Sequence, residues 1–359
     1  MADIFQRKRD HIALSHTGDV GHGQHRGLFE HVHLVHQAIP ELSMDALDLT
    51  TPFGHRELSA PLMLTGMTGG PPEAGDINRD LARICDALGL AFGVGSQRVM
   101  TRADVATPTF QVRSHAPNVV LLGNVGINQA RDMGTQAVKD LMEAIEADFM
   151  AIHLNPAMEL VQPGADADRD FREGYDTLGR LMEALDGHIV VKECGSGISP
   201  AVMSRLVSLG VPLVDVSGSG GTSWVKVEAL RAQGPLADLG LTFADWGIPT
   251  AAAVALAADA RAQVSASKTQ IIASGGIANG LTATKALALG ADIAGMARPA
   301  LQAYMDHGVE GATTFLKTVI SGVRMGMALT GSRRPEEVRT ASKIITGDLQ
   351  AWVQQGRLG

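Results

Sequence analysis

Short apolar runs alternate with longer amphipathic stretches along most of the chain. Each apolar run is rich in aliphatic or β-branched residues, and the stretch after it carries apolar residues at three- and four-residue spacing. This alternation predicts repeated strand–helix units, and nearly continuous hydrophobicity is typical of parallel strands covered by helices. The predicted strands are residues 61–65, 90–95, 119–124, 149–154, 189–193, 212–217, 271–275 and 293–297.

The stretches with the clearest helical periodicity are residues 80–88, 138–147 and 281–289. Eight strand–helix units in succession predict an α/β fold, specifically one closed (β/α)8 TIM barrel. The main alternative is an open doubly wound sheet, but the Gly-x-Gly-x-x-Gly turn typical of such sheets is absent after the first strand. We predict a single domain, with an N-terminal extension at 1–60, the barrel at 61–309 and C-terminal helices at 310–359.

Composition and charge narrow the class of protein without changing the predicted fold. With 45% hydrophobic and 19% charged residues among 359, the chain can bury a large core. Its net charge of −8 argues against a nucleic-acid partner, because phosphate backbones are bound by clusters of Lys and Arg. No apolar run approaches the ~20 residues of a membrane span, and the N-terminus lacks the apolar stretch of a secretory signal. We expect a cytoplasmic protein with no membrane partner.

The two cysteines, Cys85 and Cys194, each stand alone in their segments. Neither a disulfide framework nor a thiolate metal site is indicated. A reducing compartment is the natural setting for such a chain.

The seventh predicted strand ends in the glycine-rich sequence Ser274-Gly275-Gly276-Ile277, with a helix after it. Paired glycines expose backbone N–H groups without side-chain obstruction, and the following helix adds its positive end. The eighth strand ends similarly in Gly295-Met296-Ala297, and barrels commonly bind one phosphate between the loops of strands seven and eight. A phosphate site is therefore predicted. The alternative is that the glycines only allow two tight turns where the chain reverses direction.

Other strand ends also carry small polar residues, on which a planar ring could lie with few clashes. Such residues would place a flat cofactor across the mouth of the barrel. The candidates are Thr65, Met67, Thr68 and Gly69 after the first strand, Ser96 after the second, Asn124 on the third, and Ser217 and Thr222 around the sixth.

Three residues on the fourth and fifth strands could act on a ligand in the mouth. His153 and Asn155 are two residues apart, so they share a side if the strand is still extended there. Lys192 points inward by strand alternation, and an inward Lys is costly to bury unless it meets an anion. That anion could be a carboxylate of the barrel or a reduced, negatively charged ring.

The N-terminal cluster of Arg7, Lys8 and His11 would by itself be interpreted as a solvated charged face.

Together these residues resemble the type 2, FMN-dependent isopentenyl diphosphate isomerases, and the resemblance covers nearly the whole chain. No single motif is decisive, but seven in the same order are highly specific. They are Arg7-Lys8-x-x-His11, Met67-Thr68-Gly69-Gly70, Ser96-Gln97-Arg98, His153-Leu154-Asn155-Pro156, Val191-Lys192-Glu193, the segment from Ser217 through Thr222 to Trp224, and Ser274-Gly-Gly-Ile277.

The resemblance implies a TIM-barrel isomerase of isoprenoid biosynthesis that moves a double bond between isopentenyl and dimethylallyl diphosphate. It implies reduced FMN as the acid–base group, NADPH as the reductant, Mg²⁺, and assembly into tetramers or octamers. FMN would contact Thr65, Met67, Thr68, Gly69, Ser96, Asn124, Lys192, Ser217 and Thr222, with its phosphate on Ser274 to Ile277 and on Gly295, Met296 and Ala297. The allylic or homoallylic diphosphate would contact Arg7, Lys8, His11, Ser96, Arg98, His153 and Asn155, with residues 1–60 as a cap.

In this resemblance His153, Asn155 and Lys192 are the catalytic candidates, and Glu159 is the Mg²⁺ ligand. The chain departs from the family at Met158, where the family usually has a substrate-facing Gln. It is also longer after Gln162. Since Met cannot make the hydrogen bonds of an amide, either Gln162 or water replaces them, or that contact is dispensable.

Three other functions share parts of this pattern. An FMN oxidoreductase of the hydroxy-acid oxidase or dihydroorotate dehydrogenase kind needs a substrate-specific base and a carboxylate-binding group, which the sequence does not reveal. An enzyme like inosinate dehydrogenase needs a nucleophilic Cys after the sixth strand, where none occurs. A non-catalytic flavin or phosphometabolite binder stays open, because a fold alone does not fix function.

Overall fold

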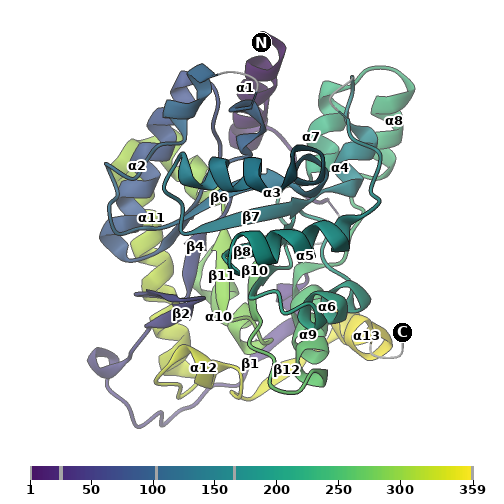
Figure 1. The fold of residues 1–359 in the computed structure, drawn as a ribbon. Helices are drawn as coiled ribbons and strands as arrows, with labels where there is room; N and C mark the ends of the chain where they lie inside the picture. Colours follow the sequence, from purple (N-terminus) through teal and green to yellow (C-terminus); the bar gives the residue numbers. More distant parts are fainter. Residues whose placement is uncertain (1, 24–26, 102–103, 165–166, 357–359) are drawn as a thin grey trace.

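The computed structural model describes residues 2–23, 27–101, 104–164 and 167–356. At its centre lies a closed barrel of eight parallel strands (Figure 1). Each strand pairs with the next along the chain, and the barrel closes where Met296 pairs with Leu64. The predicted (β/α)8 barrel is confirmed, and the open sheet is excluded. The strands are β4 Leu62–Leu64, β5 Ala91–Gly93, β6 Val120–Gly126, β7 Phe149–Leu154, β8 Ile189–Glu193, β9 Leu213–Asp215, β10 Gln270–Ser274 and β11 Ile293–Met296.

The predicted strand limits differ from the observed ones by up to two residues at either end. β7 and β8 have the predicted bounds. β9 ends at Asp215 rather than at 217, because Ser217 adopts a positive φ of 38° and leaves the ladder. β6 instead continues to Gly126, where it still pairs with His153 on β7.

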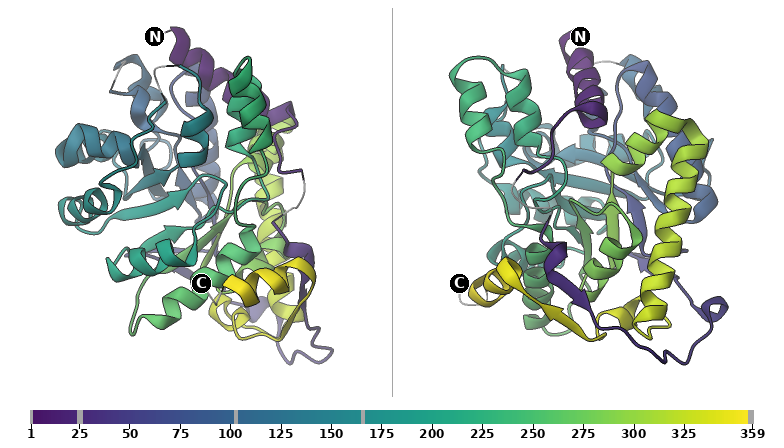
Figure 2. Two further views of the ribbon diagram at one scale, coloured as in Figure 1. Left: turned by 90° about the vertical axis from the view of Figure 1, so that its right-hand side faces the viewer. Right: turned by 180° about the vertical axis from the view of Figure 1, so that it is seen from behind.

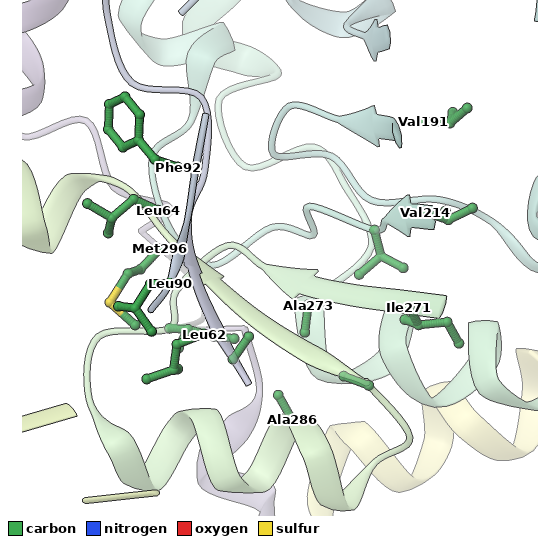
Figure 3. Close-up of a cluster of buried hydrophobic side chains, with 14 of the residues drawn as sticks. Leu62, Leu64, Leu90, Phe92, Val191, Val214, Ile271, Ala273, Ala286 and Met296 are labelled. Atoms are coloured by element: carbon green, nitrogen blue, oxygen red, sulfur yellow. The ribbon is translucent and has the colours of Figure 1, made fainter. Parts of the chain in front are cut away.

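Helices on the outside of the barrel cover the outward faces of the strands. Outward side chains such as Leu62, Phe92 and Val214 point toward these helices, and Ala286 of α10 faces back (Figure 3). Two predicted helices begin too late, because α2 already starts at Pro72 and α3 starts at Ile127, before a kink at Gly134. The barrel helices are α2 Pro72–Leu88, α3 Ile127–Glu143, α5 Gly174–Ala184, α6 Pro200–Ser208, α9 Thr250–Gln263, α10 Gly280–Ala288 and α11 Arg298–Leu329.

Inside the barrel, the inward positions change from apolar to polar along the strands. The lower layers hold Met63, Leu122, Ala151, Val190 and Ile272, among other buried apolar side chains. On six of the eight strands the inward side chain two residues further along is polar. These polar residues are Thr65, Asn124, His153, Lys192, Asp215 and Ser274.

A small hairpin, β2 Thr51–Phe53 and β3 Arg56–Leu58, closes the amino-terminal end of the barrel. Phe53 and Leu58 are buried in the same cluster as the interior strand residues. The ring of Phe53 meets that of Phe149 edge to face, with 5.2 Å between centroids. The hairpin therefore acts as the floor of the barrel interior.

Additional helices lie at the opposite end, where α1 Ala2–Thr17 sits near α7 Trp224–Arg231 and α8 Pro235–Thr242 (Figures 1 and 2).

The expectation that residues 310–359 form helices was wrong in one element, because β12 Lys343–Ile345 pairs with β1 Val32–Leu34. Three residues are too few to show a strand period. The remaining elements are α4 Pro156–Val161, α12 Pro335–Val338, α13 Gly347–Gly356 and the 3-10 turns Phe29–His31, Met44–Ala46, Gln97–Val99 and Asp104–Thr109.

No helix within the described ranges is both long and apolar enough to cross a bilayer. The proposed division at 60/61 and 309/310 stays a prediction, and α11 is kinked at Gly308, just before the second boundary. Residues 1, 24–26 and 357–359 of the outer segments lie outside the described residues.

Replacement of Phe53 by Ala should lower the free energy of unfolding by about 3–5 kcal/mol, because a fully buried ring is lost from a closed core. Urea unfolding followed by circular dichroism measures it. Phe243→Ala is the matched control, since that ring is 43% exposed, and should cost less than about 1 kcal/mol. An unchanged urea midpoint for Phe53→Ala would show that the hairpin does not contribute to the barrel core.

Candidate active site

One cavity of about 510 Å³ opens at the carboxyl ends of the barrel strands and is lined by residues from all eight. It brings together every residue predicted for cofactor, substrate and metal except Gly69. Gly69 packs instead against Phe110, whose ring would lie 2.1 Å from an added Cβ. The sequence thus identified the right turn but not the reason for its glycine.

The glycine turn after β10 forms one end of the cavity. Gly275 and Gly276 have φ of 101° and 80°, and an added Cβ would lie 2.1 Å from the Gly218 oxygen or 2.8 Å from the Gly220 oxygen. Side chains are therefore excluded on both steric and conformational grounds. Within the described residues, no hydrogen bond uses the N–H of Gly276 or Ile277 as donor. This backbone fits a bound anion.

Helix ends add to the positive character of this turn. The 32-residue helix α11 begins at Arg298, directly after β11, and its first residues line the cavity. The N–H groups of a helix's first turn have no partner within the helix, so they favour a negative ligand. The hydroxyl of Thr250 donates to the Gly275 carbonyl at 2.6 Å and holds the turn in place.

Three cations form the other end of the cavity. Arg7 and Lys8 come from α1, and Arg98 comes from the turn after β5. Burial, together with the charges of Arg7 and Arg98, lowers the pKa of Lys8 to about 8. Crowded like charges are unfavourable without an anion between them, so this end fits a multiply charged ligand.

A buried carboxylate fixes α1 over the cavity. The side chain of Glu228 on α7 is fully buried, and it accepts a hydrogen bond from His11 Nε2 at 2.9 Å and one from Arg231 at 2.6 Å. Its Oε1 also lies 3.5 Å from Arg7 Nε. Although burial opposes ionisation, His11, Arg7 and Arg231 lower the pKa of Glu228 to about 2. The N-terminal cluster is a built contact, not a solvated face.

His11 takes part in this contact as a neutral ring. Burial lowers the pKa of His11 to about 4, despite the opposing effect of Glu228. Its Nε2–H is therefore already used by the carboxylate, although the ring lines the cavity and meets Trp224 edge to face at 5.0 Å. His11 therefore helps to hold helix α1 over the cavity and does not supply a positive charge to a ligand.

His153 is a neutral hydrogen-bonding group at the centre of the cavity. Burial, together with the charges of Lys192, Lys8, Arg7 and Arg98, lowers the pKa of His153 to about 3. Asn124 Nδ2 donates to the Val94 carbonyl at 3.1 Å, which turns Asn124 Oδ1 toward His153 Nδ1 at 2.8 Å. Nδ1 must then carry the proton, which leaves Nε2 as an acceptor.

Lys192 is buried beside His153 on the neighbouring strand, and its Nζ donates to the Glu193 carbonyl at 2.7 Å. Burial alone would lower its pKa, but the acidic groups of Cys194, Asp215 and Glu193 outweigh burial and raise the pKa of Lys192. Lys192 therefore stays protonated at neutral pH, because the neighbouring acidic groups favour its charged form. The Glu193 carboxylate faces the other way and accepts from the N–H groups of Cys194 and Ser196, both at 2.5 Å.

Glu159 lines the cavity from α4, and its two oxygens are held differently. Oε1 accepts from Asn155 Nδ2 at 3.0 Å, and Oε2 accepts from the N–H of Asp168 at 2.9 Å. Each oxygen keeps a lone pair for a hard cation, which fits Mg²⁺ shared with a diphosphate. The described residues contain no cluster of three or more metal-ligating side chains, so protein alone would not complete the coordination.

Met158 also lines the cavity, beside Asn155. The nearby amide of Gln162 does not replace the missing Gln at that position, because Gln162 is buried and its Oε1 accepts from Arg7 at 2.7 Å. Of the longer segment after Gln162, residues 165–166 lie outside the described residues. The departure at Met158 therefore leaves an apolar wall in the cavity.

Three functional candidates were not found from the sequence. Glu228 lies 217 residues from His11, so no local pattern could connect them. Gln129 lies in the first turn of α3 and lines the cavity beside His153. Asp215 interrupts an apolar strand, and strand alternation would have placed it beside Lys192.

Comparison with known proteins agrees with this geometry. Residues 128–345 match the family model described as FMN-dependent dehydrogenase. Among solved structures, a lactate oxidase of Pediococcus acidilactici aligns over 96% of this chain and 94% of its own, with a TM-score of 0.69 and 15% identity. A flavocytochrome b2 variant with sulfite bound aligns over 91% of this chain and 81% of its own, with a TM-score of 0.68 and 16% identity. At such low identity these two structures show the fold alone.

Sequence relatives are much closer. The isopentenyl-diphosphate delta-isomerase of Ignicoccus hospitalis is 39% identical over 356 residues, which cover 98% of this chain and 96% of the relative. The protein of the same name from Synechococcus sp. is 43% identical over 346 residues, covering 94% and 97%. The chain therefore belongs to the isopentenyl-diphosphate delta-isomerase family, in the type that shares the FMN-dependent dehydrogenase domain.

Proposed function

We propose that this protein interconverts isopentenyl and dimethylallyl diphosphate on a reduced FMN in the mouth of the barrel. The observation that carries the proposal is a single cavity with two separate anion-binding ends. The backbone turn after β10 forms one end, and the cations of α1 and Arg98 form the other. A ligand with one phosphate and a second ligand with a diphosphate would use both ends.

FMN fits two neighbouring parts of the cavity: the glycine turn after β10 and the polar floor formed by the other strand ends. Its phosphate would lie on the N–H groups of residues 275–277 and 295–297. Its ring would lie over Thr65, Met67, Thr68, Ser96, Asn124 and Ser217, beside Lys192 and Thr222. When bound in reduced form, FMN supplies the acid–base group that the side chains of this cavity do not provide.

The substrate diphosphate fits the cationic end. Arg7, Lys8 and Arg98 would bind its oxygens, and Mg²⁺ on Glu159 would neutralise further charge. The capping helix α1 is held by Glu228, so the charged groups are in place before substrate binds. Preorganised cations need little rearrangement when the diphosphate binds.

The reaction adds a proton to one carbon of the alkene and removes a proton from another, with no net oxidation. His153 cannot donate that proton near neutral pH, because its pKa of about 3 keeps the ring neutral. Its role would be to orient the ligand: Asn124 fixes the ring through Nδ1, and Nε2 would accept a hydrogen bond from the ligand. Asn155 ties the same region to Glu159.

Several further properties belong to the proposal. NADPH would reduce the flavin transiently, since the sequence carries no dinucleotide fingerprint. The protein would be cytoplasmic and would assemble into tetramers or octamers, as the family resemblance implies. Gly69 would support the flavin floor through Phe110 rather than by contact.

The competing functions fit the cavity less well. A cysteine nucleophile is disfavoured, because Cys85 is buried in α2 and burial raises the pKa of Cys194 to about 11. Cys194 also follows the fifth barrel strand rather than the sixth. A simple flavin binder would not need the cationic end of the cavity or the buried carboxylate that holds the cap.

Purified protein should convert isopentenyl diphosphate into dimethylallyl diphosphate under anaerobic conditions with FMN, Mg²⁺ and NADPH. Product is measured by mass spectrometry after chromatography, and omission of the reductant should abolish turnover. Equal turnover with oxidised FMN would contradict the reduced-flavin mechanism. Absence of product under all conditions would overturn the isomerase function and leave the barrel unaffected.

Replacement of Arg7 by Ala should raise KM for the diphosphate about 10- to 100-fold, because a hydrogen bond to a charged group is lost. FMN content, read from visible absorbance, should not change. Arg9→Ala is the matched control, because Arg9 lies on the same helix but pairs with Glu73 at the surface. Equal KM values for the two variants would argue against substrate contact by α1.

The free enzyme should lose substrate affinity as pH rises through about 8, the pKa of Lys8. Below that pH the ammonium is present, and above it the charge is lost. The nearby His153 titrates far lower, and the pKa of Lys192 is raised, so neither accounts for this step. A pH profile of kcat/KM measures it, and Lys8→Gln should remove the step. A step that persists in Lys8→Gln would assign it to another group.

A further inference from the structure

Asp215 is a buried carboxylate inside the barrel to which neither the cofactor site nor the substrate site assigns a role. It is 1% exposed and lies on β9, directly beside Lys192 in the register of β8 and β9. Their neighbours Val191 and Val214 point outward to the helices (Figure 3), so both charged side chains point into the barrel.

The hydrogen bonds of Asp215 hold it in one orientation. Ser274 Oγ donates to Asp215 Oδ1 at 2.7 Å, and the N–H of Ser217 donates to the same oxygen at 3.1 Å. Both bonds involve Oδ1, which leaves Oδ2 available to other partners. A second, small cavity of about 10 Å³ lies between Thr65, Asn124, Lys192 and Asp215, which is room for one water molecule.

A carboxylate at this depth needs a positive partner, because an unpaired charge in an apolar interior is strongly unfavourable. The layer below Asp215 is apolar, formed by Leu213 and Ile272 among others. Lys192 is the cation that acts on it: burial raises the pKa of Asp215, while Lys192 and the bonds from Ser274 and Ser217 oppose that rise. Asp215 in turn helps to raise the pKa of Lys192.

We propose that Asp215 is a positioning residue that helps to keep Lys192 charged from inside the barrel, while the Glu193 carbonyl holds the ammonium in place. This inference rests on the proposed function, since Lys192 would stabilise the negative charge of a reduced ring. Asp215 itself lies beneath the cavity floor and contacts neither ligand. Its carboxylate acts through the ammonium.

Several other groups face this pair and must be considered. His153 on β7 is neutral, because burial and the charges of Lys192, Lys8, Arg7 and Arg98 all lower its pKa. Glu193 and Cys194 lie on its own strand end, and burial raises the pKa of Glu193 to about 7. Asp215 differs from these acids because it comes from another strand and is inside the barrel.

The test uses Asp215→Asn, which keeps size and hydrogen bonding but removes the charge. The midpoint potential of bound FMN is measured without any diphosphate, so the result does not depend on isomerase activity. At alkaline pH the potential should become more negative, because Lys192 loses its proton earlier in the variant and the reduced anionic ring then loses its positive partner. The alkaline limb of kcat should move to lower pH, and kcat should fall about tenfold or more.

Asp292→Asn is the matched control. Asp292 is also a buried carboxylate, but Arg261 and Arg339 pair with it at the amino-terminal end of β11. This change should lower stability without moving the flavin potential or the pH profile. If both variants move the potential equally, or neither does, the proposal fails.

A double-mutant cycle separates a positioning role from a structural one. Once Lys192→Gln has removed the ammonium, adding Asp215→Asn should not lower the potential further, because only the direct loss of the carboxylate charge remains and that loss favours the reduced ring. A further decrease would overturn the proposal. If Asp215→Asn alone does not fold, the double variant should recover folding because no unpaired charge remains buried, and failure of both would indicate a structural role. Asp215→Glu, which keeps the carboxylate, should shift the midpoint potential less than Asp215→Asn does.

Discussion

Closure of the parallel barrel is the constraint on which the rest of this structure depends. Closure fixes which side of every strand faces inward, so a change from apolar to polar at one level converts the whole interior at once. Below that level Phe53 and Phe149 fill the space, and above it Asn124, His153 and Lys192 face a common cavity. The site is thus built on the same strands as the core, about two residues closer to their carboxyl ends.

Much of this arrangement could be predicted because it follows a local period. Strand alternation correctly placed Lys192 in the interior and Glu193 outside, and it put His153 and Asn155 on one cavity. Paired glycines likewise marked the turn at Gly275 and Gly276. What alternation could not give was the reason for each glycine, as Gly69 shows by packing on Phe110.

Long-range contacts could not be predicted for the same reason. The cap over the cavity depends on Glu228, which binds a helix near the start of the chain. No period links those two segments, and the charged N-terminal helix would by itself suggest a surface. The strand β12 was missed because three residues cannot show a pattern, and its pairing with β1 again joins opposite ends of the chain.

The cavity's charges together favour a catalyst that is not a side chain. Each carboxylate near the mouth is already engaged: Glu159 by Asn155, Glu228 by His11, and Asp215 by Ser274. The histidine that faces the centre is neutral, and the lysine beside it is a stable cation. Proton transfer to an unactivated alkene needs a group whose pKa lies near the working pH, and Lys8, with a pKa of about 8, belongs to the cationic end of the cavity. Side chains arranged in this way orient ligands and stabilise charge, which is what a bound flavin that carries the proton would require of them.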